Sequence, residues 1–192
     1  MNYLTPLPLE EQLHCRRVAA ISKIIADAAG MSELEIKSVE QAAIFHDIGK
    51  AALPRKILCQ DKPLNRQQQS IFQRHTELGM RMLKGTEGIL STASIVAFQH
   101  HERLDGSGYF GLTAQMIHPH AKLVAVADTF DTTVFCRPAG QDQRLVQACM
   151  MLIEKGGREL SEEYILCLLN HLDQVLAACD AANAHIHINA HS

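Results

Sequence analysis

Residues 120–135 read HAKLVAVADTFDTTVF, and this stretch decides the fold class. Its apolar residues recur at the three- and four-residue spacings of an α-helix, and Pro119 just before it suits a first helical turn. The same periodicity extends over nearly the whole chain, and no run shows the clean alternation of a half-buried strand. The sequence therefore predicts an all-α fold.

Capping residues and helix breakers divide this pattern into about seven helices. Ser32 with Glu35 three residues later forms a capping box, Asn65 is a good N-cap, and Gly30 and Gly49 are placed to end helices. The segment 51–65 carries two prolines and predicts a loop. Helices are expected over about 9–29, 33–49, 66–85 and 120–135, with another from about 89 into QHHER and two that begin near Asp142 and Ser161.

The composition limits the possible partners of the protein. With 192 residues and 47% hydrophobic content, one domain is expected over 1–192, with two C-terminal helices within 141–182 and a flexible tail at 183–192. Lys and Arg total 18 against 21 Asp and Glu, and the net charge of −3 argues against duplex nucleic acid as a partner. The sequence has no apolar run of roughly 18 residues and no signal-peptide features, so no membrane contact and a cytoplasmic location are expected. The six cysteines form no CxxC pair and are expected to be reduced.

Histidine and aspartate occur together where side chains can face one cavity. His46 and Asp47 are adjacent, about 100° apart on a helix, so they can face one cavity without competing for one direction. Asp128 interrupts the apolar run LVAVADTF, and a buried carboxylate is costly unless it is paired or binds a cation. A metal ion is one such partner, and a hydrogen bond inside the core is the other. Three more histidines lie in or at the end of predicted helices: His75, His100 and His101.

The first predicted helix adds another pair of an acid and an imidazole. Glu10 and His14 stand four residues apart and therefore lie on one helix face. They are either a surface pair or part of a metal cluster, because mixed imidazole and carboxylate sites suit Fe, Mn or Zn and can hold two or more ions.

Four motifs follow one another along the chain: HDIGKAALPRKIL at 46–58, HTELGMRML at 75–83, AFQHHERLDGSGYFGL at 97–112 and AKLVAVADTFDTTVFCRP at 121–138. Their order and separations resemble the HD-GYP family of cyclic di-GMP phosphodiesterases, a branch of the HD superfamily, over about residues 9–140. The resemblance implies an HD-superfamily helical bundle whose core holds two or three divalent metal ions. The metal that the resemblance implies is commonly iron, and Mn or Zn are the alternatives.

The resemblance also assigns roles to individual residues. Asp47 and Lys50 fall on catalytic positions, Lys50 as a lysine that contacts phosphate, and Arg137 matches an arginine that binds the substrate phosphate. In the glycine-rich loop, Tyr109 and Asp105 are candidate substrate contacts, although the loop can equally be read as a simple turn. The candidate metal ligands, of which the first two match a pair found in members with a third metal, are Glu10, His14, His46, Asp47, His75, His100, His101 and Asp128.

This set of residues suits hydrolysis of a phosphodiester. Bound cations lower the pKa of water, so a metal-bridging hydroxide is a nucleophile near neutral pH, and paired metals stabilise the charge of an in-line displacement. Lys50 and Arg137 would neutralise phosphate oxygens, and the alternative for each is an ordinary surface charge. The predicted reaction opens cyclic di-GMP to linear pGpG, to GMP or to both.

Three departures from the family pattern keep other functions open. Phe110 replaces the proline of the family name, and Ala139 and Gly140 stand where an aromatic and a basic residue often follow. The chain begins almost at the first catalytic helix, which predicts either that regulation comes from a protein partner in trans or that the domain acts alone. The alternatives are a non-catalytic module that binds a cyclic dinucleotide and signals through protein contacts, and another nucleotide phosphohydrolase of the HD superfamily.

Overall fold

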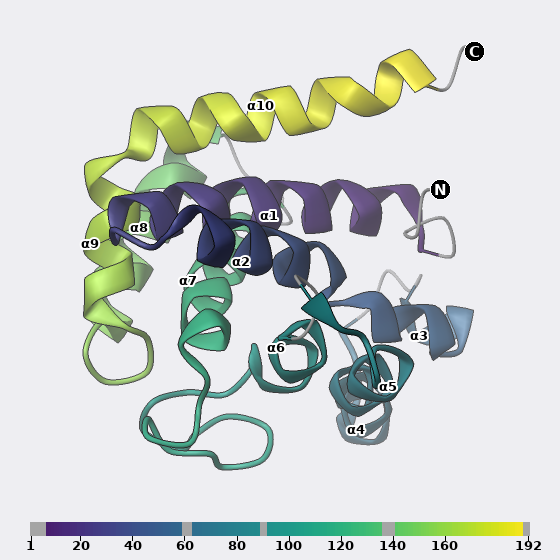
Figure 1. Cartoon of the computed structure of the whole chain (residues 1–192). Coiled ribbons are helices and arrows are strands. Elements are labelled where there is room, and N and C mark those ends of the chain that lie inside the picture. Colours follow the sequence, from purple (N-terminus) through teal and green to yellow (C-terminus); the bar gives the residue numbers. More distant parts are fainter. Residues whose placement is uncertain (1–6, 59–62, 89–91, 136–140, 190–192) are drawn as a thin grey trace.

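The computed structural model describes residues 7–58, 63–88, 92–135 and 141–189 (Figure 1). Apart from two isolated β-bridges, all regular structure in these ranges is helical, which confirms the all-α prediction. The elements are α1 (Leu9–Ala28), α2 (Glu33–Phe45), the 3-10 helix η1 (Ile48–Ala52), α3 (Arg55–Leu58), α4 (Arg66–Gln73), α5 (His75–Met82), α6 (Ala93–Gln99), α7 (Pro119–Phe135), α8 (Gln141–Lys155), α9 (Glu162–Asn170) and α10 (Leu172–Asn189).

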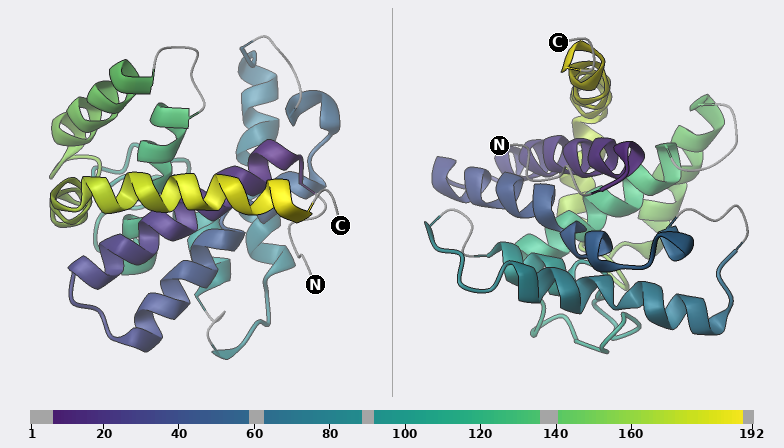
Figure 2. Two further views of the ribbon diagram at one scale, coloured as in Figure 1. Left: turned by 90° about the horizontal axis from the view of Figure 1, so that it is seen from above. Right: turned by 90° about the vertical axis from the view of Figure 1, so that its right-hand side faces the viewer.

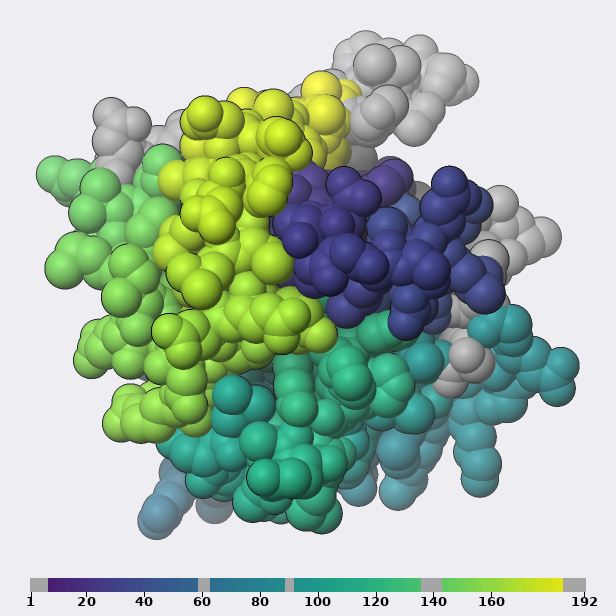
Figure 3. All heavy atoms as spheres, turned by 60° about the vertical axis from the view of Figure 1, so that its left-hand side comes forward, coloured from purple at the N-terminus to yellow at the C-terminus, as the bar shows by residue number. Residues whose placement is uncertain are grey.

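Helices α1 and α7 form the centre of the molecule. α1 packs against α2, α7 and α10, and the views of Figure 2 show α10 lying across α1. On the face drawn in Figure 3, the C-terminal helices, in yellow and yellow-green, lie directly against α1, in purple. α8 packs on α7, while α5 packs on both α6 and η1. The two central helices therefore bring together segments from both ends of the chain.

The middle of α7 is buried on all sides. Residues 123–127 are apolar, and each is at most 2% exposed. A helix that is apolar all round belongs in the centre of a fold, which explains the position of α7. Asp128 follows directly and Asp131 comes three residues later, and both are buried, so this helix carries two carboxylates into the core.

The predicted helix over 66–85 is two helices in the structure. α4 ends at Gln73 and α5 begins at His75. The break has a local cause, because the side chains of His75 and Thr76 donate to the carbonyl oxygens of Phe72 and Gln73, at 2.7 and 3.0 Å. The carbonyl oxygens at the end of α4 thus accept side-chain hydrogen bonds in place of the backbone hydrogen bonds of a continuing helix.

Other boundaries follow the predicted caps with local differences. Ser32 forms the predicted capping box, and Asn65 is the predicted N-cap, with a capping box to Gln68 that was not predicted. The predicted loop contains the short helix α3, and the last predicted helix is divided at His171 into α9 and α10. α10 continues to Asn189, past residue 182, where the tail was expected to begin. Packing of α10 on α1 supplies the tertiary contacts that stabilise helices in proteins.

The described part of the chain contains no disulfide and no single helix suited to cross a membrane. No single helix there is long and apolar enough to cross a bilayer, and only α9 taken together with the first part of α10, bent by 79°, meets the length and composition needed. The cysteines in the described ranges are free thiols, and Cys59 and Cys136 lie outside them.

Candidate metal centre

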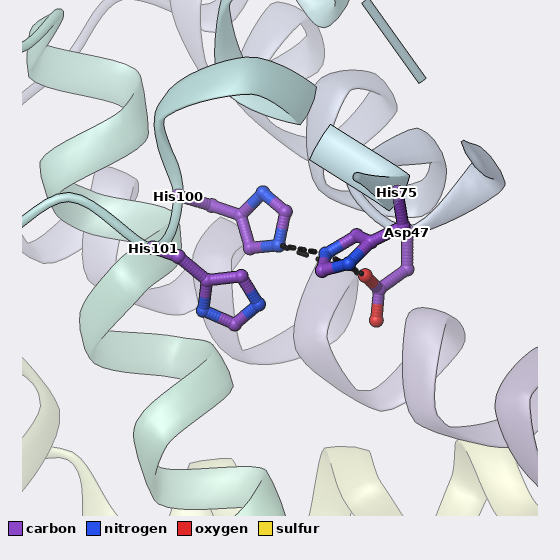
Figure 4. Close-up of side chains that lie close together, drawn as sticks. All are labelled: Asp47, His75, His100 and His101. Atoms are coloured by element: carbon purple, nitrogen blue, oxygen red, sulfur yellow. Dashed lines mark hydrogen bonds and ion pairs between the residues drawn. The ribbon is translucent and has the colours of Figure 1, made fainter. Parts of the chain in front are cut away.

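Five histidines and two aspartates from separate elements meet in the core. Asp47, between α2 and η1, is the common member of two groups whose ligand atoms lie within 4.8 Å of one another. The first group combines Asp47 with His75, His100 and His101. Figure 4 shows the side chains of Asp47, His75 and His100 turned toward one another. The second group combines Asp47 with His14 and His46. Asp128 of α7 contacts both groups, through His14 and His101.

The first group lies around one oxygen of Asp47. Nε2 of His75 lies 3.2 Å from Asp47 Oδ1, and Nε2 of His100 lies 3.6 Å from the same atom. The two Nε2 atoms are 3.4 Å apart. His101 is more exposed, and its Nδ1 lies 4.0 Å from Asp128 Oδ2.

The second group lies around the other oxygen of Asp47. Nε2 of His46 and Nε2 of His14 lie 3.3 and 3.5 Å from Asp47 Oδ2, and 3.3 Å from each other. His14 Nε2 is also 3.3 Å from Asp128 Oδ1. Asp47 therefore stands between two half-sites, one on each carboxylate oxygen.

Hydrogen bonds on the far side of the rings fix which nitrogen faces the centre. Nδ1 of His46, His75 and His100 lies 2.6, 2.7 and 3.1 Å from the backbone oxygens of Ala43, Phe72 and Ala97, respectively. Because a carbonyl oxygen only accepts, Nδ1 carries the hydrogen in each ring, and a neutral ring presents its Nε2 lone pair to the cluster. Such outer hydrogen bonds are typical of histidines that bind metals.

Burial and neighbouring charges act on the protonation of the cluster. Burial lowers the pKa of His100 to about 4 and that of His101 well below its usual value, so both rings are neutral near pH 7. Burial disfavours a charged Asp47, but attraction led by Lys50 outweighs it and holds the pKa of Asp47 well below its usual value. Burial likewise opposes a charged His14, whose hydrogen bonds to aspartates nevertheless raise its pKa. In the first group a charged carboxylate thus faces the neutral rings of His100 and His101, a combination that suits a divalent cation.

Lys50 is held next to this carboxylate. Its Nζ lies 2.7 Å from Asp47 Oδ2 and 2.7 Å from Glu11 Oε2. Burial alone would lower its pKa, but the two carboxylates raise it above the usual value, so Lys50 is charged. Glu11 was missed from the sequence, because a single acid on the first helix gives no sign that it pairs with a lysine 39 residues away.

The structure does not bring Glu10 to the cluster. Glu10 is exposed, and its neighbour Glu11 is the acid of α1 that reaches the site, through Lys50. His14 does reach it, three residues after Glu11 and on the same side of the helix. The predicted Glu10 and His14 pair is therefore divided between the surface and the core.

The glycine-rich loop is fixed by a residue that the sequence did not single out. Glu102 is buried, and its carboxylate accepts from the backbone N–H groups of Phe110 and Leu112, both at 2.8 Å. A Cβ on Gly108 would lie 2.4 Å from the Glu102 Cα, so only glycine allows the loop to pack this closely. The sequence signal that could have identified Glu102 is its position directly after His100 and His101.

The predicted substrate residues differ in position. The Tyr109 ring lies against the His101 ring, with centroids 4.6 Å apart and the ring planes tilted by 36°, and burial raises the pKa of Tyr109 to about 12. Asp105 is exposed and accepts from the backbone N–H and hydroxyl of Ser107, at 3.0 and 2.7 Å, so it shapes the loop. Arg137 lies outside the described residues, as do Ala139 and Gly140.

A cavity of about 350 Å³ opens beside the cluster. Besides His14, Asp47, His101 and Asp128 of the cluster, it is lined by Lys50, Phe72, Arg103, Thr129, Thr132, Thr133, Met151 and Lys155. Arg103 and Lys155 were not predicted from the sequence. Arg103 is oriented by donation from Nη1 to the backbone oxygens of His100 and Glu102, at 3.2 and 2.8 Å. Another cavity, of about 380 Å³ between α1 and α2, is lined by none of the candidate ligands.

Known proteins are similar to this chain in sequence. A profile of the HD domain family matches residues 7–161. The chain is 32% identical over 173 residues to the cyclic di-GMP phosphodiesterase response regulator RpfG of Xanthomonas campestris pv. campestris, covering 88% of this chain and 46% of that protein. It is 36% identical over 163 residues to a cyclic di-GMP phosphodiesterase of Thermotoga maritima, covering 84% and 44%. The 3'3'-cGAMP-specific phosphodiesterase 2 of Vibrio cholerae is 31% identical over 170 residues, covering 88% and 33%. The chain spans less than half the length of these relatives.

Solved structures share the fold. Bd1817, an HDG"Y"P protein from Bdellovibrio bacteriovorus, matches with a TM-score of 0.69 at 19% identity, over 83% of this chain and 51% of that one. The HD domain of the L. monocytogenes phosphodiesterase PgpH, in complex with cyclic-di-AMP, matches with a TM-score of 0.65 at 16% identity, over 93% and 94%. At these identities the likeness concerns the fold alone. The sequence matches show that the chain belongs to the HD domain family, and they confirm the resemblance of its four motifs to HD-GYP domains.

Proposed function

We propose that this domain is a metal-dependent phosphodiesterase that hydrolyses a cyclic dinucleotide, with cyclic di-GMP as the substrate and pGpG or GMP as the product. The observation that carries the proposal is the convergence of imidazole nitrogens on both oxygens of the buried Asp47. The relatives from Xanthomonas and Thermotoga bear the name of cyclic di-GMP phosphodiesterases, which favours that substrate over the cyclic GMP-AMP named for the Vibrio relative. A regulatory protein partner stays a prediction.

The cluster fits divalent metal ions on its own geometry. Asp47 Oδ1 is buried and accepts no hydrogen bond within the described structure, which is costly for a carboxylate oxygen unless a cation satisfies it. Two pairs of Nε2 atoms lie only 3.3 and 3.4 Å apart, and lone pairs at this spacing need a shared proton or a cation. Imidazole nitrogen with carboxylate oxygen is a donor set that Fe, Mn and Zn accept.

The donors divide naturally between two ions. His75, His100 and His101 would hold one ion with Asp47, and His14, His46 and Asp128 would hold the other with the same aspartate. When bound, the ions would lower the pKa of a water molecule and neutralise phosphate charge. We propose iron as the metal, on the resemblance to HD-GYP domains, with Mn or Zn as alternatives.

The cavity beside the cluster has the charge that a phosphodiester needs. Lys50 lies between the cluster and the cavity, and the same cavity is lined by Arg103 and by Lys155, whose ammonium pairs with Glu159. A guanidinium held by two backbone oxygens keeps a fixed orientation, so Arg103 can bind a phosphate oxygen without ordering a mobile side chain. These cations would compensate for the basic residue that often follows Arg137 and Pro138 in the family and that Ala139 and Gly140 do not supply.

The proposed function is tested by turnover with a matched variant. The protein is purified without oxygen, loaded with iron or manganese, and incubated with cyclic di-GMP or with 3'3'-cGAMP, and the products are identified. We expect pGpG or GMP from the wild type and none from Asp47→Asn at any substrate concentration, since Asn cannot supply the second anionic oxygen. A loaded wild type that binds cyclic di-GMP but releases no product would make the domain a binding module instead.

A further inference from the structure

A buried ion pair lies directly behind one of the candidate ligands. Asp131 is fully buried, and its Oδ2 lies 2.8 Å from His14 Nδ1. The Arg17 guanidinium binds both oxygens of Asp131, with Nε 2.7 Å from Oδ1 and Nη2 2.9 Å from Oδ2. Arg17 is 6% exposed and lies over the Phe135 ring, 4.4 Å from its centroid. Neither Asp131 nor Arg17 belongs to the candidate ligand set.

The pair also reaches the C-terminal helix. Nη1 of Arg17 donates to Oδ1 of Asn183 at 3.0 Å. Asn183 lies on α10, Arg17 and His14 lie on α1, and Asp131 lies on α7. The contacts therefore form one chain of hydrogen bonds from α10 to the second half-site.

The outer hydrogen bond of His14 differs from those of His46, His75 and His100. His46, His75 and His100 use backbone oxygens, whereas His14 uses a carboxylate. A carboxylate behind a metal-binding imidazole orients the ring and makes its free nitrogen a stronger donor than a carbonyl does. A bidentate arginine fixes the plane of that carboxylate, and it also balances its buried charge.

We propose that Asp131, held by Arg17, is a positioning residue that selects the tautomer of His14 and makes metal binding in the second half-site depend on the packing of α10. The inference rests on the proposed metal centre, and it concerns only the half-site of His14, His46 and Asp128. The half-site of His75, His100 and His101 has no such connection among the described residues.

The test is metal binding by Asp131→Asn, with Asp27→Asn, an exposed aspartate on α1, as the matched control. Both proteins are loaded with Mn²⁺ and dialysed against a competing chelator, and the bound metal is counted. Asp131→Asn should bind one of its two ions roughly tenfold to hundredfold more weakly, the usual effect of removing such an outer partner. Asp27→Asn should match the wild type. Unchanged affinities in Asp131→Asn, or equal weakening of both ions, would overturn the proposal.

Double variants identify the half-site that is affected. Adding Asp131→Asn to His46→Ala should cause no further loss of affinity, whereas adding it to His75→Ala should weaken binding of the remaining ion by the same roughly tenfold to hundredfold. The reverse pattern also overturns the proposal. A wild type that holds fewer than two ions would instead contradict the proposed function.

Two milder variants decide the matter if Asp131→Asn does not fold. Arg17→Lys keeps the charge but loses the two-pronged contact, and Asn183→Ala removes only the bond to α10. Both should weaken the same single ion, Arg17→Lys more than Asn183→Ala. Wild-type metal binding in both variants would show that the chain of hydrogen bonds is only structural.

Discussion

At the scale of single residues, Asp47 and Lys50 carry most of the electrostatic argument. Asp47 faces imidazoles through both oxygens, and Lys50 contacts the same carboxylate from the cavity side. Adjacent His46 and Asp47 were recognisable in the sequence as a pair at a helix end. The salt bridge of Lys50 to Glu11 was not, because it depends on how α1 lies against η1.

Replacement of Lys50 tests its contact with phosphate. Lys50→Met should raise the apparent KM for cyclic di-GMP by roughly tenfold to hundredfold, the value of a charge-assisted contact of about 1.5–3 kcal/mol. The measurement is steady-state kinetics at full metal loading, because Lys50 also balances the charge of Asp47. Lys23→Met, which removes an exposed ion pair with Glu40, is the control and should behave as the wild type. Unchanged kinetics in a fully loaded Lys50→Met would exclude the phosphate role.

At the scale of elements, the close packing of η1 on α5 sets the distance between Asp47 and His75. A Cβ on Gly49 would lie 1.9 Å from the backbone oxygen of His75 and 2.4 Å from the backbone nitrogen of Gly79. Both contacts are with backbone, so a side chain at residue 49 must push η1 away from α5. The glycine of the HDIGK motif is thus required by packing.

Gly49→Ala should therefore destabilise the protein and damage the first half-site. We expect a loss of about 1–3 kcal/mol or more in the free energy of unfolding, as for overpacked cores. Gly79→Ala is the matched control, because its Cβ would meet the Ala97 side chain at 3.2 Å and no backbone atom closer than 3.4 Å. Urea denaturation of both variants measures the difference. Equal stability of the two would mean that η1 can move without cost.

The helices show what local sequence signals can and cannot predict. The capping box at Ser32 and the N-cap at Asn65 are local signals, and both were predicted correctly. The break before His75 was not predicted, because it depends on side chains of His75 and Thr76 that take up backbone oxygens of α4. Asp131 was missed for a different reason, since its partner Arg17 is 114 residues away in the sequence.

At the scale of the whole molecule, metal binding should stabilise the fold. The proposed ligands come from α1, the segment after α2, α5, the segment after α6, and α7, so an ion would connect elements from most of the chain. A ligand that binds only the folded state at about 100 times its Kd adds about 2.7 kcal/mol. For a chain of this size, that corresponds to a rise in Tm of roughly 5–10 °C.

Thermal unfolding with and without metal measures this effect. Mn²⁺ should raise the Tm of the metal-stripped protein, and a chelator should reverse the rise. Mg²⁺ is the control ion, because it prefers oxygen ligands and should shift the Tm little at a histidine-rich site. The same Tm with Mn²⁺, Mg²⁺ and chelator would show that no ion joins these elements.

The central claim is that Asp47 bridges two metal ions, and anomalous X-ray scattering from crystals of the metal-loaded protein tests it most directly. Two anomalous peaks are predicted, one beside each carboxylate oxygen of Asp47, the first among His75, His100 and His101 and the second among His14, His46 and Asp128. A fully loaded crystal with at most one peak at Asp47, or with its metal elsewhere, would contradict the account.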